Sequence, residues 1–326
     1  STQGYSSAAS DVYKRQDIYR AFGIILMVMG HIGFGGKFDK FIHAFHMPMF
    51  FFISGFFYKE KCIDIKKYAV DKAKKLLTPY FVFGGGCCFL WCLNSGFSAE
   101  PWMHLLLINT TGIPIVGAIW FLTALFFTDV IYIFLAKYNI KWIILFLVAA
   151  GSYADQVLTN PLPWALSAAF VGLGLYWIGN ETAKNQDILK AVLNMPLLLC
   201  IILGILEAKL ILFNGYINMR EGTYAFVPLF WVNAILSIFT GISVSKKVEN
   251  AIRGTIMASW LISIGRESIV YLCCNQLVIK VVTAIFGHFM AFSAVGNGIV
   301  LVVSMMVLYM LSVLLTKTKL KIIVGK

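Results

Sequence analysis

The chain has 326 residues, of which 60% are hydrophobic and 13% are charged, and its mean hydropathy is +0.81. Soluble domains carry about 25% charged residues, so this composition excludes a soluble globular protein. The 27 basic residues outnumber the 15 acidic ones and give a formal net charge of +12.

Apolar segments of membrane-spanning length follow one another along the whole chain. We expect ten transmembrane helices, near residues 18–36, 41–58, 76–94, 117–136, 141–154, 163–180, 191–213, 223–245, 266–286 and 295–316. The only sizeable connectors are residues 95–116 and 215–222, which leave no room for a soluble domain. The predicted fold class is therefore all-α: a polytopic integral membrane protein whose helices form one bundle.

Ten spans place both termini on the same side of the membrane, and the basic residues indicate which side. Seven lysines lie between residues 59 and 75 on the side of the termini, whereas the opposite side carries only Lys37, Lys40, Lys209 and Arg220. By the positive-inside rule, both termini are expected in the cytoplasm. Topology and contact with anionic lipid then explain the positive charge, so we expect membrane lipid and no nucleic acid as a partner.

The first sixteen residues differ from the rest in being small and polar. The string from Ser6 to Gln16 resembles a translated sequencing-library adapter. We therefore interpret residues 1–16 as a non-native leader and residues 17–326 as a single membrane domain.

Three polar residues share one face of the first predicted helix. Eleven steps separate Arg20 from His31, which is three turns plus roughly 20°, or about 16 Å along the axis. Asp17 falls within roughly 40° of the same face. Because polar groups inside a membrane helix are costly, they usually mark a site. His31 alone is as well explained by a hydrogen bond to a neighbouring helix. Its alignment with Arg20 and Asp17 favours a catalytic role, as a general base.

Further candidate residues follow along the chain. His46 lies near Pro48 in the second predicted span, and the basic loop contains Lys72 and Lys75. These lysines suit either an ordinary cytoplasmic loop or the phosphates of a coenzyme. Further polar residues in or beside predicted spans include Trp120, Asp129, Glu207, Arg220, Arg266, Glu267 and Asn275. From the residues alone, the chain is a membrane protein with a polar site that opens to the cytosol, which fits a transporter as well as an enzyme.

Two motifs resemble the signature of the membrane acyltransferase-3 family. They are Asp17-x-x-Arg20-x10-His31 and the segment Phe45-His46-Met47-Pro48 that continues to Ser54-Gly55. The second motif is similar to the subgroup named for fucose 4-O-acetylase. Weaker similarities lie at Lys72-x-x-Lys75, Trp120-Phe121-Leu122, Asn218-Met219-Arg220 and Gly265-Arg266-Glu267-Ser268. Two lysines stand where the family has an Arg-x-x-Arg pair, and Asn275 stands near the place where many relatives have histidine.

The resemblance implies a multi-pass O-acyltransferase of the bacterial cytoplasmic membrane. Such an enzyme moves an acyl group, usually acetyl, from cytoplasmic acyl-CoA to a sugar hydroxyl of a cell-envelope polysaccharide or its lipid-linked precursor. The implied donor-binding residues are Arg20, Lys72, Lys75 and Arg266. His31 would deprotonate the acceptor hydroxyl or carry the acyl group, with Asp17 orienting Arg20. Candidates on the acceptor side are His46, Trp120, Arg220 and Asn275.

The alternative function is a transporter of a small solute such as an amino acid, like the membrane domain of vancomycin-resistance serine racemases. The absence of a second copy of the Asp-x-x-Arg-x10-His pattern mildly favours the enzyme, because transporters often contain repeats. The seven cysteines show no zinc spacing with histidines, so we expect neither a metal nor a permanently bound cofactor.

Overall fold

The computed structural model describes residues 2–59, 64–286 and 293–326, without the side chains of residues 2–15 and 155. It is 82% helical, which confirms the all-α fold class. The long helices are α1 (Thr2–Ile32), α2 (Gly36–Phe56), α3 (Ile65–Ser95), α5 (Trp120–Lys137), α6 (Ile143–Val157), α7 (Leu166–Lys184), α9 (Leu197–Asn214), α10 (Val227–Ile252), α11 (Ile256–Arg266), α12 (Ser268–Phe286) and α13 (Ala294–Lys317). The short elements are α4 (Glu100–Leu106), η1 (Gly117–Ile119), η2 (Pro163–Ala165), α8 (Gln186–Leu193), η3 (Lys319–Val324) and the strands β1 (Ile217–Asn218) and β2 (Thr223–Tyr224).

Six helical segments of the described chain are long and apolar enough to cross a membrane. They are α3, η1 with α5, α9, α10, α12 and α13. A multi-pass membrane protein is therefore supported, whereas the count of ten spans and the cytoplasmic termini stay predictions. The helix α1 begins at Thr2. The interpretation of residues 1–16 as a leader and of residues 17–326 as the membrane domain also stays a prediction.

Helix boundaries differ from the expected ones where local chemistry interrupts an apolar run. The first helix ends at Ile32, because Gly33 and Gly35 adopt left-handed φ angles of 87° and 112°. The expected span 191–213 is divided into α8 and α9 around Pro196, which cannot continue the preceding helix. The expected span 223–245 begins instead with β2, the second strand of the antiparallel hairpin β1–β2, and α10 starts at Val227.

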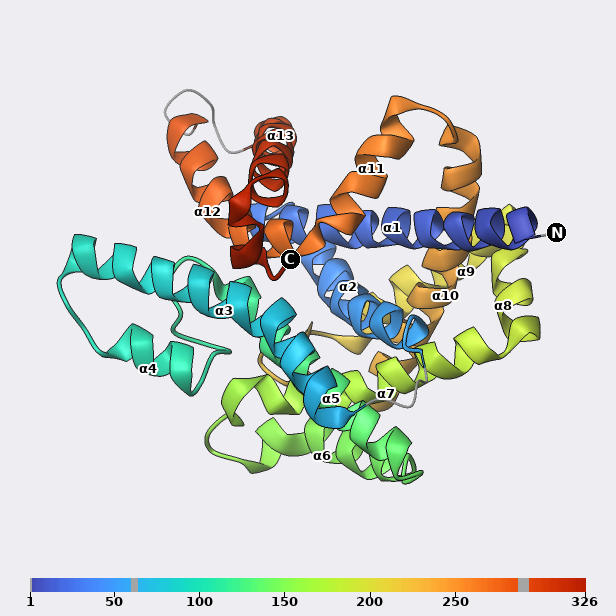
Figure 1. The fold of residues 1–326 in the computed structure, drawn as a ribbon, viewed down its shortest axis with the longest axis horizontal. Coiled ribbons are helices and arrows are strands. Elements are labelled where there is room, and N and C mark those ends of the chain that lie inside the picture. Colours follow the sequence, from blue (N-terminus) through green and yellow to red (C-terminus); the bar gives the residue numbers. More distant parts are fainter. Residues whose placement is uncertain (1, 60–63, 287–292) are drawn as a thin grey trace.

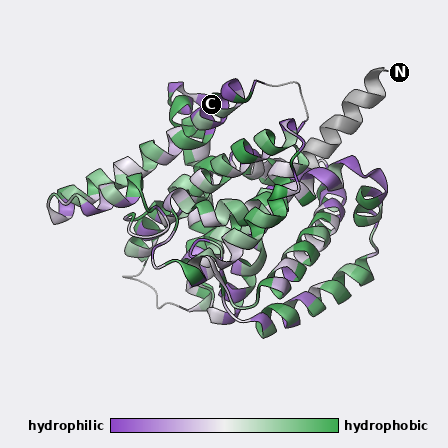
Figure 2. Ribbon diagram, turned by 90° about the horizontal axis from the view of Figure 1, so that it is seen from below, coloured by the Kyte–Doolittle hydropathy of each residue, from purple (hydrophilic) through white to green (hydrophobic). Residues whose placement is uncertain are grey.

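The helices α1 and α2 occupy the centre of the bundle. In Figure 1 they lie between α11–α13 on one side and α5–α7 on the other. The colouring in Figure 2 shows that most helices are hydrophobic along their length, as expected for helices that pack on lipid and on each other. This central position places the polar residues of α1 beside α11 and α12, which contact Asp17 and His31 respectively.

Two glycines allow helices to approach α1 and α2 closely. A Cβ atom on Gly265 of α11 would meet the carbonyl oxygen of Asp17, and one on Gly55 of α2 would meet the carbonyl oxygen of Tyr176 on α7. Small residues at such crossings let helix backbones touch, which is how membrane helices associate. The first contact fixes α11 against the start of the polar face of α1.

Candidate active site

A basic cavity opens between α1, α2, α3, α5, α12 and the C-terminal segment. It has a volume of about 530 Å³, and its charged lining residues are Arg20, Lys75, Arg266, Glu267 and Lys326. Four of these five side chains are cationic, and Glu267 forms an ion pair with Lys326. A cavity with this excess of positive charge suits an anionic ligand.

Asp17 connects the two arginines of the basic cavity. Its carboxylate lies 3.6 Å from Nη1 of Arg20 and 3.8 Å from Nε of Arg266. The Gly265 contact brings Arg266 to this place, because it holds the end of α11 against the backbone of Asp17. One carboxylate does not neutralise two guanidinium groups, so positive charge is left for a ligand.

Lys72 does not line the basic cavity, although Lys75, three residues away, does. The Nζ of Lys72 lies 2.8 Å from Oδ2 of Asp129, whose side chain is 1% exposed. The hydroxyls of Tyr68 and Tyr176 donate to Oδ1 of the same carboxylate, at 3.2 and 2.9 Å. Lys72 thus neutralises a buried carboxylate between α3, α5 and α7.

A second cavity, the histidine cavity, lies at the other end of α1. It has a volume of about 200 Å³, and its polar lining residues are His31, His43, His46, Trp120, Asn218, Arg220 and Gln276. His31 lies on the last turn of α1 and is exposed, whereas His46 of α2 is buried. The structure therefore brings together His31, His46, Trp120 and Arg220, which the sequence indicated separately.

The hairpin between α9 and α10 supplies the one guanidinium group of the histidine cavity. The Nε of Arg220 donates to the carbonyl oxygen of Thr110 at 2.5 Å, and its backbone N–H donates to Oδ1 of Asn218 at 3.0 Å. Burial lowers the pKa of Arg220 from its ordinary value, and Glu221 opposes this change. The guanidinium still keeps its charge at neutral pH. Arg220 is therefore a fixed cation at the rim of the cavity.

The face of α1 that carries Arg20 and His31 contributes lining residues to both cavities. Ile24 lines the basic cavity, Met27 lines the histidine cavity, and Leu272 of α12 lines both. Arg20 and His31 stand about 16 Å apart along the helix axis at 1.5 Å per residue.

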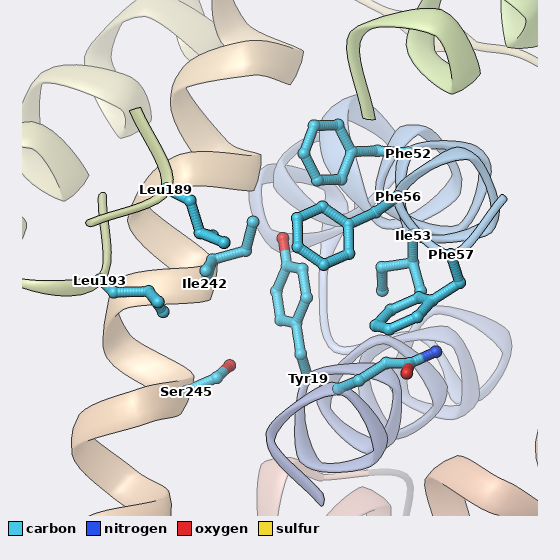
Figure 3. A pocket seen from close by; sticks show the side chains of 10 residues that line it. Tyr19, Phe52, Ile53, Phe56, Phe57, Leu189, Leu193, Ile242 and Ser245 are labelled. Atoms are coloured by element: carbon cyan, nitrogen blue, oxygen red, sulfur yellow. The ribbon is translucent and has the colours of Figure 1, made fainter. Parts of the chain in front are cut away.

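A third, smaller cavity of about 80 Å³ is apolar and has no charged lining residue. Figure 3 shows the rings of Phe52 and Phe56 on α2, and of Phe57 directly after it, beside Tyr19 of α1, with Leu189 and Ile242 opposite. The hydroxyl of Tyr19 donates to the carbonyl oxygen of Ile238 at 3.2 Å. The lining hydroxyls are those of Tyr19 and Ser245, and among the described residues no histidine, carboxylate or amine lines this cavity to activate them, so it is not a candidate catalytic site.

A family model described as an acyltransferase domain matches residues 14–317. The chain belongs to the acyltransferase-3 family. This confirms the family resemblance of its motifs and supports a membrane acyltransferase, while the subgroup is not confirmed. No curated protein and no solved structure matches the chain.

On α12, the structure places the predicted acceptor-side residue Asn275 outside the histidine cavity and its neighbour Gln276 in the cavity. Asn275 is fully buried and donates to the carbonyl oxygens of Tyr271 and Leu272 on its own helix, so it does not line the histidine cavity. Gln276 lines the cavity and contacts His31, and sequence reasoning missed it. The motif had indicated the neighbouring residue, Asn275. Adjacent residues of an α-helix point about 100° apart, so the two side chains face different surroundings. Lys326 was missed as well, and no motif indicated it.

Proposed function

We propose that this acyltransferase moves an acyl group, specifically acetyl, from cytoplasmic acyl-CoA to a sugar hydroxyl of a cell-envelope polysaccharide or its lipid-linked precursor. The observation that carries the proposal is that the basic cavity and the histidine cavity lie along the same face of α1 and share the lining residue Leu272. One cavity offers cations for the phosphates of the coenzyme, and the other offers imidazoles for the reaction. The arm of the coenzyme would lie along α1 between them.

The donor is bound by charge in this proposal. Arg20 can hold a phosphate through two parallel N–H donors, and Lys75 acts as a point charge. Arg266 completes the set, with Asp17 holding both guanidinium groups in place. Asp17 is a positioning residue here, because it contacts cations and not the reacting atoms.

The acceptor hydroxyl enters the histidine cavity. The hydroxyl oxygen attacks the thioester carbonyl carbon, the carbon–sulfur bond breaks, and the coenzyme leaves as a thiolate. The imidazoles that line the histidine cavity suit direct transfer with removal of the hydroxyl proton, and they also suit a covalent acyl-histidine. Trp120 and Arg220 border the acceptor in this proposal. The guanidinium group of Arg220 suits a glycan that carries a negatively charged group. A transporter gains no support from the family match.

Binding of [14C]acetyl-CoA to the purified protein in lipid nanodiscs tests the donor assignment. Arg20→Gln or Lys75→Met should each weaken binding about tenfold, which corresponds to about 1.4 kcal/mol for one exposed charge-assisted contact. The matched control is Lys74→Met, because Lys74 is exposed on the neighbouring position of α3 and does not line the basic cavity. Absent binding, or equal affinity in all four proteins, would contradict acyl-CoA as the ligand of this cavity.

A further inference from the structure

The side chain of Gln276 bridges the backbone of η1 and the ring of His31. Its Oε1 accepts a hydrogen bond from the backbone N–H of Ala118 at 3.1 Å, and its Nε2 lies 3.3 Å from Nδ1 of His31. A backbone N–H can only donate, so Ala118 orients the amide with its oxygen toward η1. The amide NH2 group then faces His31.

This orientation determines which nitrogen of His31 carries the proton. Because the amide NH2 can only donate, Nδ1 of His31 accepts and carries no proton. A neutral imidazole has one N–H group, which must then be on Nε2. In this state Nε2 of His31 is a hydrogen-bond donor and cannot take a proton from a hydroxyl.

His46 has the opposite arrangement in the same cavity. Its Nδ1 lies 2.6 Å from the carbonyl oxygen of Ile42, which can only accept, so Nδ1 carries the proton. The lone pair of Nε2 is therefore free to accept a proton. Among the described residues, no hydrogen-bond donor is recorded for this nitrogen. His46 is also only 7% exposed, so solvent competes little for its lone pair.

We propose that the two histidines divide the reaction, with Gln276 as the positioning residue that sets the division. This proposal rests on the proposed acyl transfer. Nε2 of His46 accepts the proton of the acceptor hydroxyl, while Nε2–H of His31 donates a hydrogen bond to the thioester carbonyl oxygen. Donors aimed at a developing oxyanion contribute about 10²–10³-fold to rate.

The proton and electron balance closes without another reactant. The hydroxyl oxygen forms a bond to the carbonyl carbon as its proton moves to His46. The negative charge on the carbonyl oxygen is held by Nε2–H of His31. When the carbonyl re-forms, the electron pair of the carbon–sulfur bond leaves with sulfur. The proton on His46 then passes to the coenzyme thiolate or to water, which returns both rings to their starting states.

The nitrogen-15 NMR spectrum of histidine-labelled protein in lipid bilayers reads these proton positions without any turnover. The chain has five histidines, and spectra of His31→Gln and His46→Gln assign the two signals. We expect an unprotonated Nδ1 in His31 and an unprotonated Nε2 in His46. Gln276→Glu should move the proton of His31 from Nε2 to Nδ1. One carboxylate oxygen would then accept from Nδ1–H of His31, and the other would keep the contact with the backbone N–H of Ala118. A protonated Nδ1 of His31 in the wild type would overturn the assignment.

Steady-state kinetics of acetyl transfer measure the roles. Gln276→Glu should lower kcat about 10²-fold and leave the KM for acetyl-CoA unchanged, because the tautomer changes and the donor site does not. His46→Gln should lower kcat by at least about 10²-fold. His104→Gln is the matched control, since Nδ1 of His104 also contacts a backbone carbonyl, that of Ile108, at 3.2 Å, while His104 does not line the histidine cavity. Wild-type kcat in His46→Gln, or a larger loss in His43→Gln, whose Nδ1 contacts the carbonyl of Asp39 at 2.7 Å in the same cavity, would overturn the role of His46. Correct tautomers without acyl transfer would overturn both histidine roles and the proposed function, but not the effect of Gln276 on the ring.

Discussion

Lys72 and Lys75 lie three residues apart in one motif, and their substitutions should have opposite consequences. Lys72 pairs with Asp129, which is 1% exposed, while Lys72 itself is 29% exposed. Removing one partner of a buried ion pair costs about 3–5 kcal/mol, because the other charge is left buried and unpaired. Since Lys72 keeps some contact with solvent, we expect Lys72→Met to lower the free energy of unfolding by about 3 kcal/mol, the lower end of that range.

Removing the carboxylate should recover most of that loss. In the Lys72→Met/Asp129→Asn double variant no charge is buried, and the amide oxygen still accepts from Tyr68 and Tyr176. A double-mutant cycle should therefore give a coupling energy of about 2 kcal/mol between the two positions. The assay is unfolding in mixed SDS micelles, followed by circular dichroism. A loss under about 1 kcal/mol for Lys72→Met, or no recovery in the double variant, would refute the reasoning.

Lys75→Met provides the contrast, because Lys75 is exposed and lines the basic cavity. It should change the free energy of unfolding by less than about 0.5 kcal/mol, as exposed substitutions usually do. It should weaken acetyl-CoA binding, whereas folded Lys72→Met protein should bind with nearly wild-type affinity. If Lys72→Met weakened binding more than Lys75→Met did, Lys72 would be a donor-binding residue.

Three further predictions follow from the packing of α1, α9 and the hairpin. Gly265→Ala should push α11 away from Asp17 and lower the thermal midpoint by several degrees, and an unchanged midpoint would contradict the close contact. Glu207→Gln should leave the thermal midpoint unchanged or raise it. The buried carboxyl of Glu207 accepts a hydrogen bond from Ser237, and an amide oxygen keeps that bond without a charge to bury. A lower midpoint would show that the charge is needed. Arg220→Met should raise the KM for the glycan acceptor and leave acetyl-CoA binding unchanged, and a loss of acetyl-CoA binding would place the guanidinium on the donor side.

The sequence predicted the fold class and the helix that carries the site. Arg20 and His31 could be related from spacing alone, because both lie on one straight helix with a known rotation per residue. The boundaries near Gly33 and Pro196 were less predictable, since a long apolar run hides the residues that interrupt a helix inside it. The helix α11 (Ile256–Arg266) was not predicted, because its 11 residues are too few to span a membrane, and α12 begins at Ser268, close to the expected start at residue 266.

The parts of the site that depend on two helices could not be predicted. The spacing of Lys72 and Lys75 says nothing about which lysine faces Asp129, because this depends on how α3 is rotated against α5. The choice between Asn275 and Gln276 similarly depends on the face that α12 turns to α1. Sequence patterns describe rotation within a helix, whereas these contacts are set by packing between helices.

Acetyl transfer by the His31→Ala variant tests the central claim most directly. The measurement is incorporation of [14C]acetyl from acetyl-CoA into the cell-envelope glycan of membranes that contain wild-type or variant protein at equal abundance. We predict a loss of at least about 10²-fold in His31→Ala, with acetyl-CoA affinity within about twofold of the wild type, because His31 lies in the histidine cavity and not among the cations of the donor site. Undiminished incorporation by the variant would contradict the role of His31 and the site built around it.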